Sequence, residues 1–455
     1  MKRLVLRGGR VIDPAGNCDR VADLILVDGR IAALEPGGMG AVADAQIIDC
    51  AGWWVVPGLI DPHVHLRDPG FPQKETIASG LSAAAAGGFT TVAAMANTAP
   101  VNDAPAITHY MLEQARQVRA ARLVPVSAVT RNLAGRELVD VVAMAGAGAR
   151  LFSDDGIPID NAELLQAAFH AVARLDRAIS LHEEDRALTA EGAINAGAVA
   201  ERLGLAGIPP SAESARVRRD LALARDAGAA VHIAHISTVE AVEIVRTARD
   251  GGLPVTCEAA PHHFTLDDRA VLEFGVDAKM SPPLRTVHDR DALRAGLADG
   301  TIDMIATDHA PHDPASKKFD RLGPLFHPGR VAEHLSPADA RTMATAANGI
   351  VGLETALGLA LALVHQGVIT PARLVELMAV NPARLLRLPL AGTLATGAPA
   401  DVTVIDPDRQ WTVDPATFRS RSHNMPYTGM KLKGLAILTI VAGEIVHDAR
   451  GARPR

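Results

Sequence analysis

The chain has 455 residues, too many for one simple core, so we expect one large domain and one smaller domain. Hydrophobic residues make up 48% and aromatic residues only 3%, which predicts a globular protein whose core is packed mostly by Ala, Val, Leu and Ile. The net charge of −7 disfavours nucleic acid or an anionic membrane as the main partner.

The two ends of the chain carry similar strand patterns. Residues 1–56 contain short apolar runs, and Asp28-Gly29 between two of them is typical of a hairpin turn. Near the other end, residues 401–406 predict a strand and residues 438–446 predict a hairpin that turns at Ala442-Gly443. Neither end is large enough to bury a core alone. We therefore expect residues 1–56 and 390–455 to pair into one small β-sandwich domain, with residues 57–389 inserted between them.

Strands and helices alternate in the inserted part of the chain. An apolar run, Trp53 to Ile60, predicts the first buried strand. Ala-rich helical stretches such as Ile77–Ala86, Ala162–Leu175 and Ser214–Asp226 separate most of the later ones. The seven later strand candidates are Thr90–Met95, Arg122–Val129, Ala149–Phe152, Ala178–His182, Ala230–His235, Pro254–Glu258 and Asp303–Thr307. Eight strands alternating with helices predict a parallel (β/α)8 barrel of the TIM type.

Polar side chains follow the strands where a barrel of this type carries its chemistry, at the carboxyl ends. His63 and His65 are two apart, so on a strand they point into the same space. Histidine or aspartate also follows the fourth, fifth, sixth and eighth strands. These residues are Asp154, Asp155, His182, His235, Asp308, His309 and His312. A single His or Asp at a strand end is more often a cap or a core hydrogen-bonding group than a ligand, but five such ends together predict a metal site.

The cysteines and the amino terminus bear on localisation. Cys18, Cys50 and Cys257 are widely separated and odd in number, which fits a reducing compartment without a disulfide framework. The amino-terminal apolar run is too short for a signal-peptide core, and no stretch approaches the length of a membrane span. We therefore expect a soluble cytoplasmic protein.

Several motifs, in this order along nearly the whole chain, resemble those of one known family. They are Asp61-Pro62-His63-Val64-His65-Leu66-Arg67-Asp68-Pro69-Gly70, Ala96-Asn97-Thr98, Phe152-Ser153-Asp154-Asp155-Gly156, His235-Ile236-Ser237-Thr238, Pro261-His262-His263, Pro282-Pro283-Leu284-Arg285, Asp308-His309-Ala310-Pro311-His312 and Gly349-Ile350-Val351-Gly352-Leu353-Glu354-Thr355. The chain is similar to bacterial dihydroorotases of the long-chain type, in the amidohydrolase superfamily. The His-x-His strand is shared across that superfamily, whereas the Leu-Arg that follows it and the Asp-His-Ala-Pro-His element narrow the resemblance.

The resemblance implies a site for two Zn²⁺ ions. His63, His65 and Asp308 would hold the first ion, and His182 and His235 would hold the second. Many members of the superfamily bridge the ions with a carboxylated lysine on the fourth strand, where this chain has none. In similar dihydroorotases the second Asp of Asp-Asp-Gly takes that place, which implies Asp155 as the bridge and a structural role for Asp154.

The resemblance also implies a reaction. Two divalent ions lower the pKa of a shared water, and Asp308 would carry the proton of that water to the ring nitrogen. In the reverse direction, N-carbamoyl-L-aspartate would be cyclised to L-dihydroorotate and water, a step of pyrimidine biosynthesis.

Four residues are predicted to bind this substrate, which carries a carboxylate. Arg67 lies two residues past His65, on the same face if the strand continues, and a guanidinium grips a carboxylate with two hydrogen bonds. Asn97 would add an amide contact, and the resemblance implies that His312 also contacts the substrate carboxylate. An Asn that contacts the substrate ring commonly precedes Pro-Pro-Leu-Arg in the family. Ser281 stands there in this chain, and its shorter hydroxyl predicts a lost or water-mediated contact.

Further expectations concern the barrel mouth and the partners. The segment of about 313–348 is longer than is usual in the family. It contains a helical stretch at Pro337–Ala347 and is a candidate lid, and His327 and His334 within it are given no metal role.

Two other functions stay open: another cyclic amidohydrolase (a hydantoinase, dihydropyrimidinase or allantoinase), and a non-catalytic partner of aspartate transcarbamoylase. Arg67 argues against the first and the full set of ligands against the second. We expect a homodimer, and an active chain that also binds aspartate transcarbamoylase stays possible.

Overall fold

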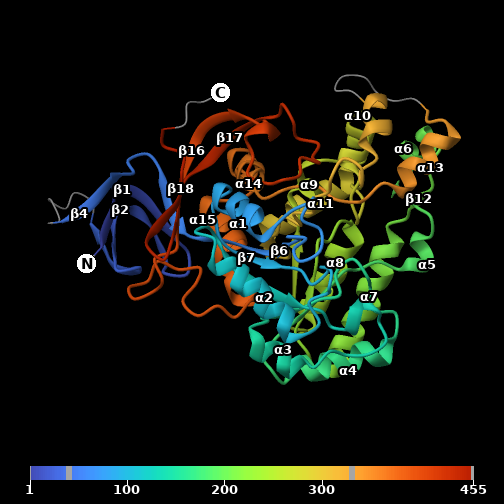
Figure 1. The fold of residues 1–455 in the computed structure, drawn as a ribbon, viewed down its shortest axis with the longest axis horizontal. Helices are drawn as coiled ribbons and strands as arrows, with labels where there is room; N and C mark the ends of the chain where they lie inside the picture. The colour runs from blue at the N-terminus through green and yellow to red at the C-terminus, as the bar shows by residue number, and fades with distance from the viewer. Residues whose placement is uncertain (1, 37–43, 327–333, 452–455) are drawn as a thin grey trace.

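The computed structural model describes residues 2–36, 44–326 and 334–451. Two eight-stranded sheets organise these residues, one built from the central part of the chain and one from its two ends. The strands near both termini lie together at one end of the molecule, and the helix-covered central part forms the rest (Figure 1).

The central sheet is the predicted barrel. Its strands are β6 (Leu59–Val64), β7 (Phe89–Ala94), β8 (Arg122–Ser127), β9 (Leu151–Phe152), β10 (Ile179–Leu181), β13 (Val231–Ile233), β14 (Val255–Ala259) and β15 (Met304–Ile305). They are parallel and follow one another around the sheet in chain order. The barrel closes where the backbone amide of His65 donates to the carbonyl of His309, 2.9 Å away. The (β/α)8 fold class is thus confirmed.

One main helix follows each barrel strand. These helices are α1 (Ile77–Ala86), α2 (Pro105–Arg116), α3 (Val141–Ala147), α4 (Ala162–Ala173), α7 (Ser211–Ala227), α8 (Val239–Asp250), α11 (Val287–Asp299) and α14 (Ala356–His365). The predicted bounds of the first are met at both ends, because the Thr76 side chain caps its amino end and Gly87 follows its last residue. Shorter helices lie in the connections, namely α5 (Arg186–Thr189), α6 (Ala198–Leu203), α9 (Pro261–Thr265), α10 (Ala270–Phe274), α15 (Pro371–Val375) and α16 (Asn381–Leu385).

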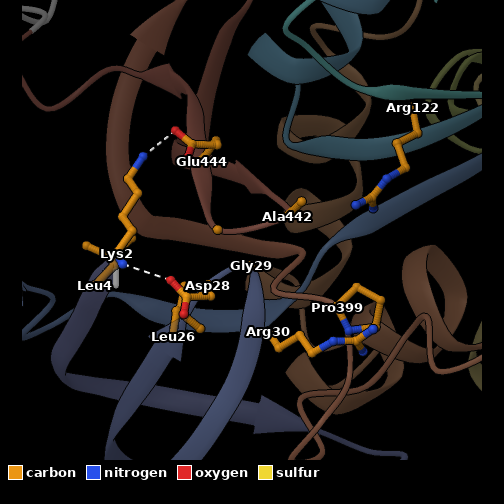
Figure 2. Close-up of a pocket in the computed structure, with 11 residues that line it drawn as sticks. Lys2, Leu4, Leu26, Asp28, Gly29, Arg30, Arg122, Pro399, Ala442 and Glu444 are labelled. Carbon is orange, nitrogen blue, oxygen red and sulfur yellow. Dashed lines mark hydrogen bonds and ion pairs between the residues drawn. The ribbon is translucent and has the colours of Figure 1, made fainter. Parts of the chain in front are cut away.

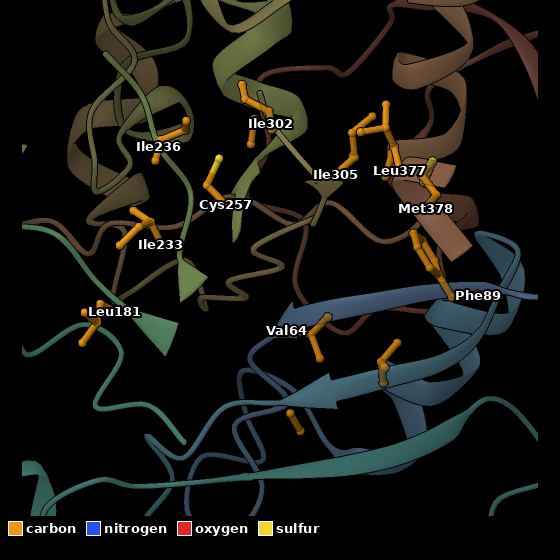
Figure 3. Packing of buried hydrophobic residues seen from close by; sticks show 14 of the residues in the cluster. Val64, Phe89, Leu181, Ile233, Ile236, Cys257, Ile302, Ile305, Leu377 and Met378 are labelled. Atoms are coloured by element: carbon orange, nitrogen blue, oxygen red, sulfur yellow. The ribbon is translucent and has the colours of Figure 1, made fainter. Parts of the chain in front are cut away.

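The barrel wall and the surrounding helices enclose one large apolar cluster. Aliphatic side chains fill most of it, as the low aromatic content predicts. Figure 3 shows Leu181, Ile233 and Cys257 on the neighbouring strands β10, β13 and β14, and all three belong to this cluster. Leu377 and Met378, from the π-helical turn Glu376–Val380, meet this layer from outside β15, so the last part of the insert supports the barrel where its eighth strand is short.

The second sheet joins the two ends of the chain. Its strands are β1 (Arg3–Asp13), β2 (Cys18–Val27), β3 (Arg30–Pro36), β4 (Ala45–Asp49), β5 (Trp54–Pro57), β16 (Val402–Thr412), β17 (Lys431–Val441) and β18 (Glu444–Asp448). β5 pairs with β1 on one side and with β16 on the other, so the amino-terminal and carboxy-terminal strands share one sheet around its own apolar cluster. Both predicted hairpin turns are present, with positive φ at Asp28, Gly29, Ala442 and Gly443. The small β-domain made from both termini is confirmed.

The apolar run from Trp53 to Ile60 forms two strands, and its prediction as one strand is wrong. β5 ends at Pro57 in the small sheet, and β6 begins at Leu59 in the barrel. Gly58 lies between them, and its amide donates to the carbonyl of Asp401. A Cβ at this position would lie 2.2 Å from Oγ1 of Thr90, so only glycine lets the chain pass here from one sheet to the other.

The candidate lid is anchored on the barrel by its own contacts. Its helices are α12 (Phe319–Leu322) and α13 (Pro337–Thr345), the second ending before the predicted Ala347. Leu322 and Met343 pack in an apolar cluster with Leu203 and Val271. The buried Lys317 ammonium donates to the carbonyl of Gly349 at 2.9 Å. His334 contacts the carbonyl of Arg202, and His327 lies outside the described residues.

Candidate active site

Six of the predicted side chains meet at the carboxyl end of the barrel, and we call them the histidine–aspartate cluster. They are His63, His65, Asp155, His182, His235 and Asp308. Each is at most 7% exposed. They come from the ends of five strands, β6, β9, β10, β13 and β15, which parallel pairing brings to one rim of the barrel. Sequence positions up to 245 residues apart, from His63 to Asp308, thus form one polar centre.

The first half of the cluster is a triad of ligand atoms. Nε2 of His65 lies 3.1 Å from Oδ1 of Asp308, and Nε2 of His63 lies 3.5 Å from the same oxygen. These three atoms all lie within 4.8 Å of one another, close enough to face one metal ion. The backbone at Asp308 has a φ of 46°. Residues other than glycine rarely adopt this conformation, and they do so mostly where the surrounding structure enforces it.

Asp155 lies between the two halves of the cluster. Its Oδ2 is 3.4 Å from Nε2 of His65. Its Oδ1 is 3.4 Å from Nε2 of His235 and 3.7 Å from Nδ1 of His182. Nδ1 of His182 and Nε2 of His235 are themselves 2.9 Å apart. Oδ1 also lies 3.5 Å from Nε2 of His63, so this one carboxylate faces imidazoles of both halves of the cluster.

The neighbouring Asp154 points away from the cluster. Its Oδ1 accepts hydrogen bonds from the amides of Val129 and Thr130, at 2.7 and 3.0 Å. Its second oxygen accepts from the hydroxyl of Thr130. Both oxygens of the Asp154 carboxylate therefore bind the loop after β8, which is a structural role.

The donor set of the cluster fits divalent cations. Nε2 of His63 and Oδ1 of Asp155 are buried and have no hydrogen-bond partner among the described residues. Burial alone would lower the pKa of the His63 imidazole, but the carboxylates of Asp155, Asp308 and Glu258 outweigh burial and raise it well above its usual value. Buried negative charge of this density calls for cations, and imidazole with carboxylate is a donor set that zinc accepts.

Two carboxylates behind the cluster were missed by the sequence analysis. Oε1 of Glu258, at the end of β14, is 2.6 Å from Nδ1 of His63, and its other oxygen contacts Nε2 of His232 at 3.1 Å. Oε2 of Glu184 is 3.0 Å from Nε2 of His182. Each carboxylate accepts one ring N–H and so leaves the opposite nitrogen free to face the centre of the cluster. A buried Glu at the end of a predicted apolar strand was the available signal for Glu258.

Arg67 and His312 form a pair beside the cluster, which we call the Arg67–His312 pair. Nη2 of Arg67 lies 3.2 Å from Nε2 of His312, and Nε of Arg67 donates to the carbonyl of Pro311 at 3.3 Å. Burial and the Arg67 charge lower the pKa of the His312 imidazole to about 2, so this imidazole accepts the hydrogen bond as a neutral ring. Arg67 was expected to share a strand face with His65 if the strand continued. The strand does not continue, because β6 ends at Val64 and Arg67 has a φ of 58°.

Asn97 and Ser281 lie outside the histidine–aspartate cluster. Oδ1 of Asn97 is 2.9 Å from Nδ1 of His65, so Asn97 sets the orientation of that imidazole as Glu258 does for His63. Ser281 is half-buried just before Pro282, whose carbonyl is 2.9 Å from Nε2 of His263. Among the described residues, no hydrogen bond joins the Ser281 hydroxyl to the cluster.

A second hollow lies far from the cluster, between the turns of the small sheet and the start of β8. Its volume is about 540 Å³, and Figure 2 shows Lys2, Arg30 and Arg122 around it. Each cation already has a partner: Lys2 contacts Glu444, Arg122 contacts Asp401, and Arg30 donates to the carbonyl of Gly397 at 2.7 Å. This hollow therefore lacks the free charge that a ligand site would offer.

A family profile and curated relatives both match this chain. The profile of the family described as Dihydro-orotase-like matches residues 52–241. Proteins named dihydroorotase from Syntrophus aciditrophicus and Desulfotalea psychrophila are 46% and 49% identical to this chain, over 98% and 97% of its length and 99% and 98% of theirs.

Solved structures give the same picture for the fold. The L-hydantoinase (dihydropyrimidinase) of Arthrobacter aurescens matches with a TM-score of 0.85 at 26% identity, over 98% of this chain and 96% of that one. The dihydropyrimidinase of Brevibacillus agri matches with a TM-score of 0.79 at 23% identity, covering 98% of this chain and 95% of that one. In the part of the chain that the structure describes, no helix has the length and apolarity to cross a membrane. The proteins named dihydroorotase match this chain over nearly its whole length at almost half identity. The chain therefore belongs to the dihydroorotase family.

Proposed function

We propose that this protein is a dihydroorotase, which hydrolyses the ring of L-dihydroorotate to N-carbamoyl-L-aspartate and catalyses the reverse cyclisation in pyrimidine biosynthesis. The observation that carries this proposal is the position of the Arg67–His312 pair beside the histidine–aspartate cluster, where the Arg67 guanidinium interacts with the charges of Asp308 and Asp155. A hydrolytic centre next to a guanidinium suits a cyclic amide that carries a carboxylate. Family membership supports the same conclusion.

The proposed cofactor is a pair of Zn²⁺ ions. His63, His65 and Asp308 would hold one ion, His182 and His235 the other, and Asp155 would bridge them. When bound, the ions would supply Lewis acidity, which lowers the pKa of water and polarises a carbonyl oxygen. The orphaned atoms of His63 and Asp155 support this assignment, because buried polar atoms rarely lack a partner.

Asp308 is the proposed proton carrier. Hydrolysis adds the oxygen of water to the ring carbonyl carbon and breaks the bond from that carbon to nitrogen. The Asp308 carboxylate takes one proton from the attacking water and returns it to the departing nitrogen, so the group is restored in each cycle. Burial would raise the pKa of this carboxyl, but His63, His65 and His235 hold it well below its usual value, which keeps Asp308 ionised.

The Arg67–His312 pair is proposed to bind the substrate carboxylate. Burial lowers the pKa of the Arg67 guanidinium to about 10, which leaves it charged at neutral pH. The neutral His312 ring accepts from one N–H of Arg67 and orients the remaining donors. Asn97 and Ser281 are proposed to complete the substrate site, Asn97 through its amide nitrogen and Ser281 through its hydroxyl or a bridging water.

The properties of the protein beyond the reaction are also proposals. The three cysteines are unpaired in the structure, which supports a reducing, cytoplasmic location. The segment 313–348 is proposed as a lid over the barrel mouth, and a homodimer is the proposed assembly. Binding to aspartate transcarbamoylase would accompany activity rather than replace it, since the ligand set is complete.

The experiment that tests the proposed function is turnover of L-dihydroorotate by the purified, zinc-loaded protein. Wild type should hydrolyse it and should turn over hydantoin, dihydrouracil and allantoin far more slowly, because these rings lack the carboxylate. Asp308→Ala should abolish turnover. Absence of turnover at two zinc ions per chain, or faster turnover of hydantoin, would overturn the proposal.

A further inference from the structure

A segment from the carboxy-terminal part of the chain reaches the barrel mouth. β16 and β17 belong to the small sheet, but the connection between them leaves that sheet after the turn Pro415–Thr417. Residues 420–424 of this connection contact barrel residues 74–75 on one side and 310–312 on the other. We call residues 420–424 the crossing loop. The expected division of the chain assigned it to the small domain, whereas its contacts are with the candidate active site.

Asn424 holds the half of the site that carries His312. Its Oδ1 accepts from the backbone amide of His312 at 2.9 Å. Its Nδ2 donates to the carbonyls of Ala310 and Gly349, at 3.1 and 2.9 Å. The backbone carbonyl of Asn424 accepts from the amide of Val351 at 3.0 Å. Asn424 is 6% exposed, so these bonds have little competition from water.

The same loop holds the half of the site that carries Arg67. The hydroxyl of Ser422 donates to the carbonyl of Lys74 at 2.7 Å. The fully buried carboxylate of Glu75 accepts from the amide of Arg421 at 3.2 Å and from the hydroxyl of Ser420. Phe71 donates its amide to the carbonyl of Arg67, and Glu75 donates its amide to the carbonyl of Phe71. Residues 67–75 are thus one hydrogen-bonded turn, with Arg67 at one end and the crossing loop at the other.

The backbone at Gly349 packs directly against His312. A Cβ on Gly349 would lie 2.5 Å from the carbonyl oxygen of Ala310 and 2.6 Å from Cδ2 of His312. The backbone that Asn424 holds is therefore already in close contact with the His312 ring. Asn424 thus acts on the backbone of His312, whose ring accepts the hydrogen bond from Arg67.

We propose that the crossing loop positions the Arg67–His312 pair, with Asn424 and Ser422 as the positioning residues, and so sets the affinity of the enzyme for the substrate carboxylate. This inference rests on the proposed function. Neither side chain touches the reacting atoms. Specificity for a carboxylated ring then depends on the small domain as well as on the barrel.

A double-mutant cycle tests the inference. Kinetic constants for L-dihydroorotate are measured for wild type, Asn424→Ala, Arg67→Ala and the double variant, all at full zinc occupancy. Asn424→Ala should raise KM about 10-fold and change kcat less than about 3-fold, because it loosens binding and leaves the cluster intact. In the Arg67→Ala background the same substitution should lower kcat/KM less than about 2-fold, because the group it positions is gone.

The control and the second variant keep the test decisive. Thr417→Ala removes an exposed hydrogen bond to the carbonyl of Asp414 in the same connection and should leave both constants unchanged. Ser422→Ala removes only the bond to Lys74, and should raise KM about 3-fold even if Asn424→Ala does not fold.

Two results would overturn the inference. One is an equal loss of kcat/KM from Asn424→Ala with and without Arg67, and the other is a loss in kcat alone. If wild type does not turn over L-dihydroorotate, the proposed function fails and the inference falls with it. If wild type is active and the losses are additive, the inference alone fails.

Discussion

The histidine–aspartate cluster and the Arg67–His312 pair differ in how they are built. The cluster residues stand at or directly after barrel strands, and buried carboxylates such as Glu258 orient their imidazoles. The pair stands on two loops with positive or irregular backbone, held by a crossing loop from the other domain. The proposed chemistry therefore rests on the barrel alone, whereas the proposed specificity for a carboxylate depends on both domains.

The largest effect should come from the centre of the cluster. Asp155→Asn should lower turnover by about 10³-fold or more, because the bridging charge between the two imidazole groups is lost. Metal analysis of the purified variant should show fewer than two zinc ions per chain.

The adjacent residue provides the matched control. Asp154→Asn should keep two zinc ions and lower the free energy of unfolding by about 1–3 kcal/mol, since it weakens the bonds to Val129 and Thr130. Loss of zinc from Asp154→Asn with zinc retained in Asp155→Asn would reverse the assignment of the bridge.

The next largest effect should come from the pair. Arg67→Lys should raise KM for L-dihydroorotate about 10–100-fold, because an ammonium cannot make the two parallel hydrogen bonds of a guanidinium. The zinc content should not change, since Arg67 contacts Pro311 and His312 rather than the ligand atoms. Arg131→Lys, at a surface pair with Glu137, is the control and should leave KM unaltered. A fall in zinc content in Arg67→Lys would break the separation between the two regions.

A smaller effect should come from behind the cluster. Glu258→Gln should weaken zinc binding about 10–100-fold, because His63 loses the carboxylate that fixes its ring. Competition with a chelator measures the affinity, and turnover should recover at high zinc concentration. Glu243→Gln on the exposed face of α8 should leave the affinity unchanged. A variant that stays inactive at saturating zinc would give Glu258 a role beyond orienting His63.

The smallest effect should come from Ser281. Ser281→Asn restores the amide that is common at this position in the family, and should lower KM by no more than about 3-fold if a water already bridges the gap. A drop of about 10-fold or more would mean that the serine leaves the substrate ring without a partner.

Much of the architecture follows from local sequence patterns. The alternation of apolar runs with Ala-rich helices predicted the seven later barrel strands, each within a few residues of its observed place. Turn residues such as Asp28-Gly29 predicted the hairpins because the backbone conformation they need is local. The run from Trp53 to Ile60 failed because two strands of similar composition meet at Gly58, and only their different hydrogen-bond partners separate them.

Some residues of the candidate site could likewise be predicted from the sequence, and others could not. His63, His65 and Asp308 could be chosen from strand ends, since parallel pairing in a barrel brings such ends together, whereas Asp155 was preferred to Asp154 because of the family resemblance. Glu258 and Asn97 could not be assigned as partners of particular imidazoles, because the sequence does not say which side chains meet across the barrel.

The sequence by itself determined the barrel, the pairing of the two ends and the residue types of the cluster, because periodicity and strand-end position are properties of short segments. The tertiary structure decided which aspartate faces the imidazoles, where Arg67 meets His312, and that Asn424 reaches the barrel mouth. These are contacts between residues as far apart in the sequence as Arg67 and His312, which are separated by 245 positions, and no local pattern encodes them. Their geometry depends on loops whose course is set by packing against the rest of the molecule.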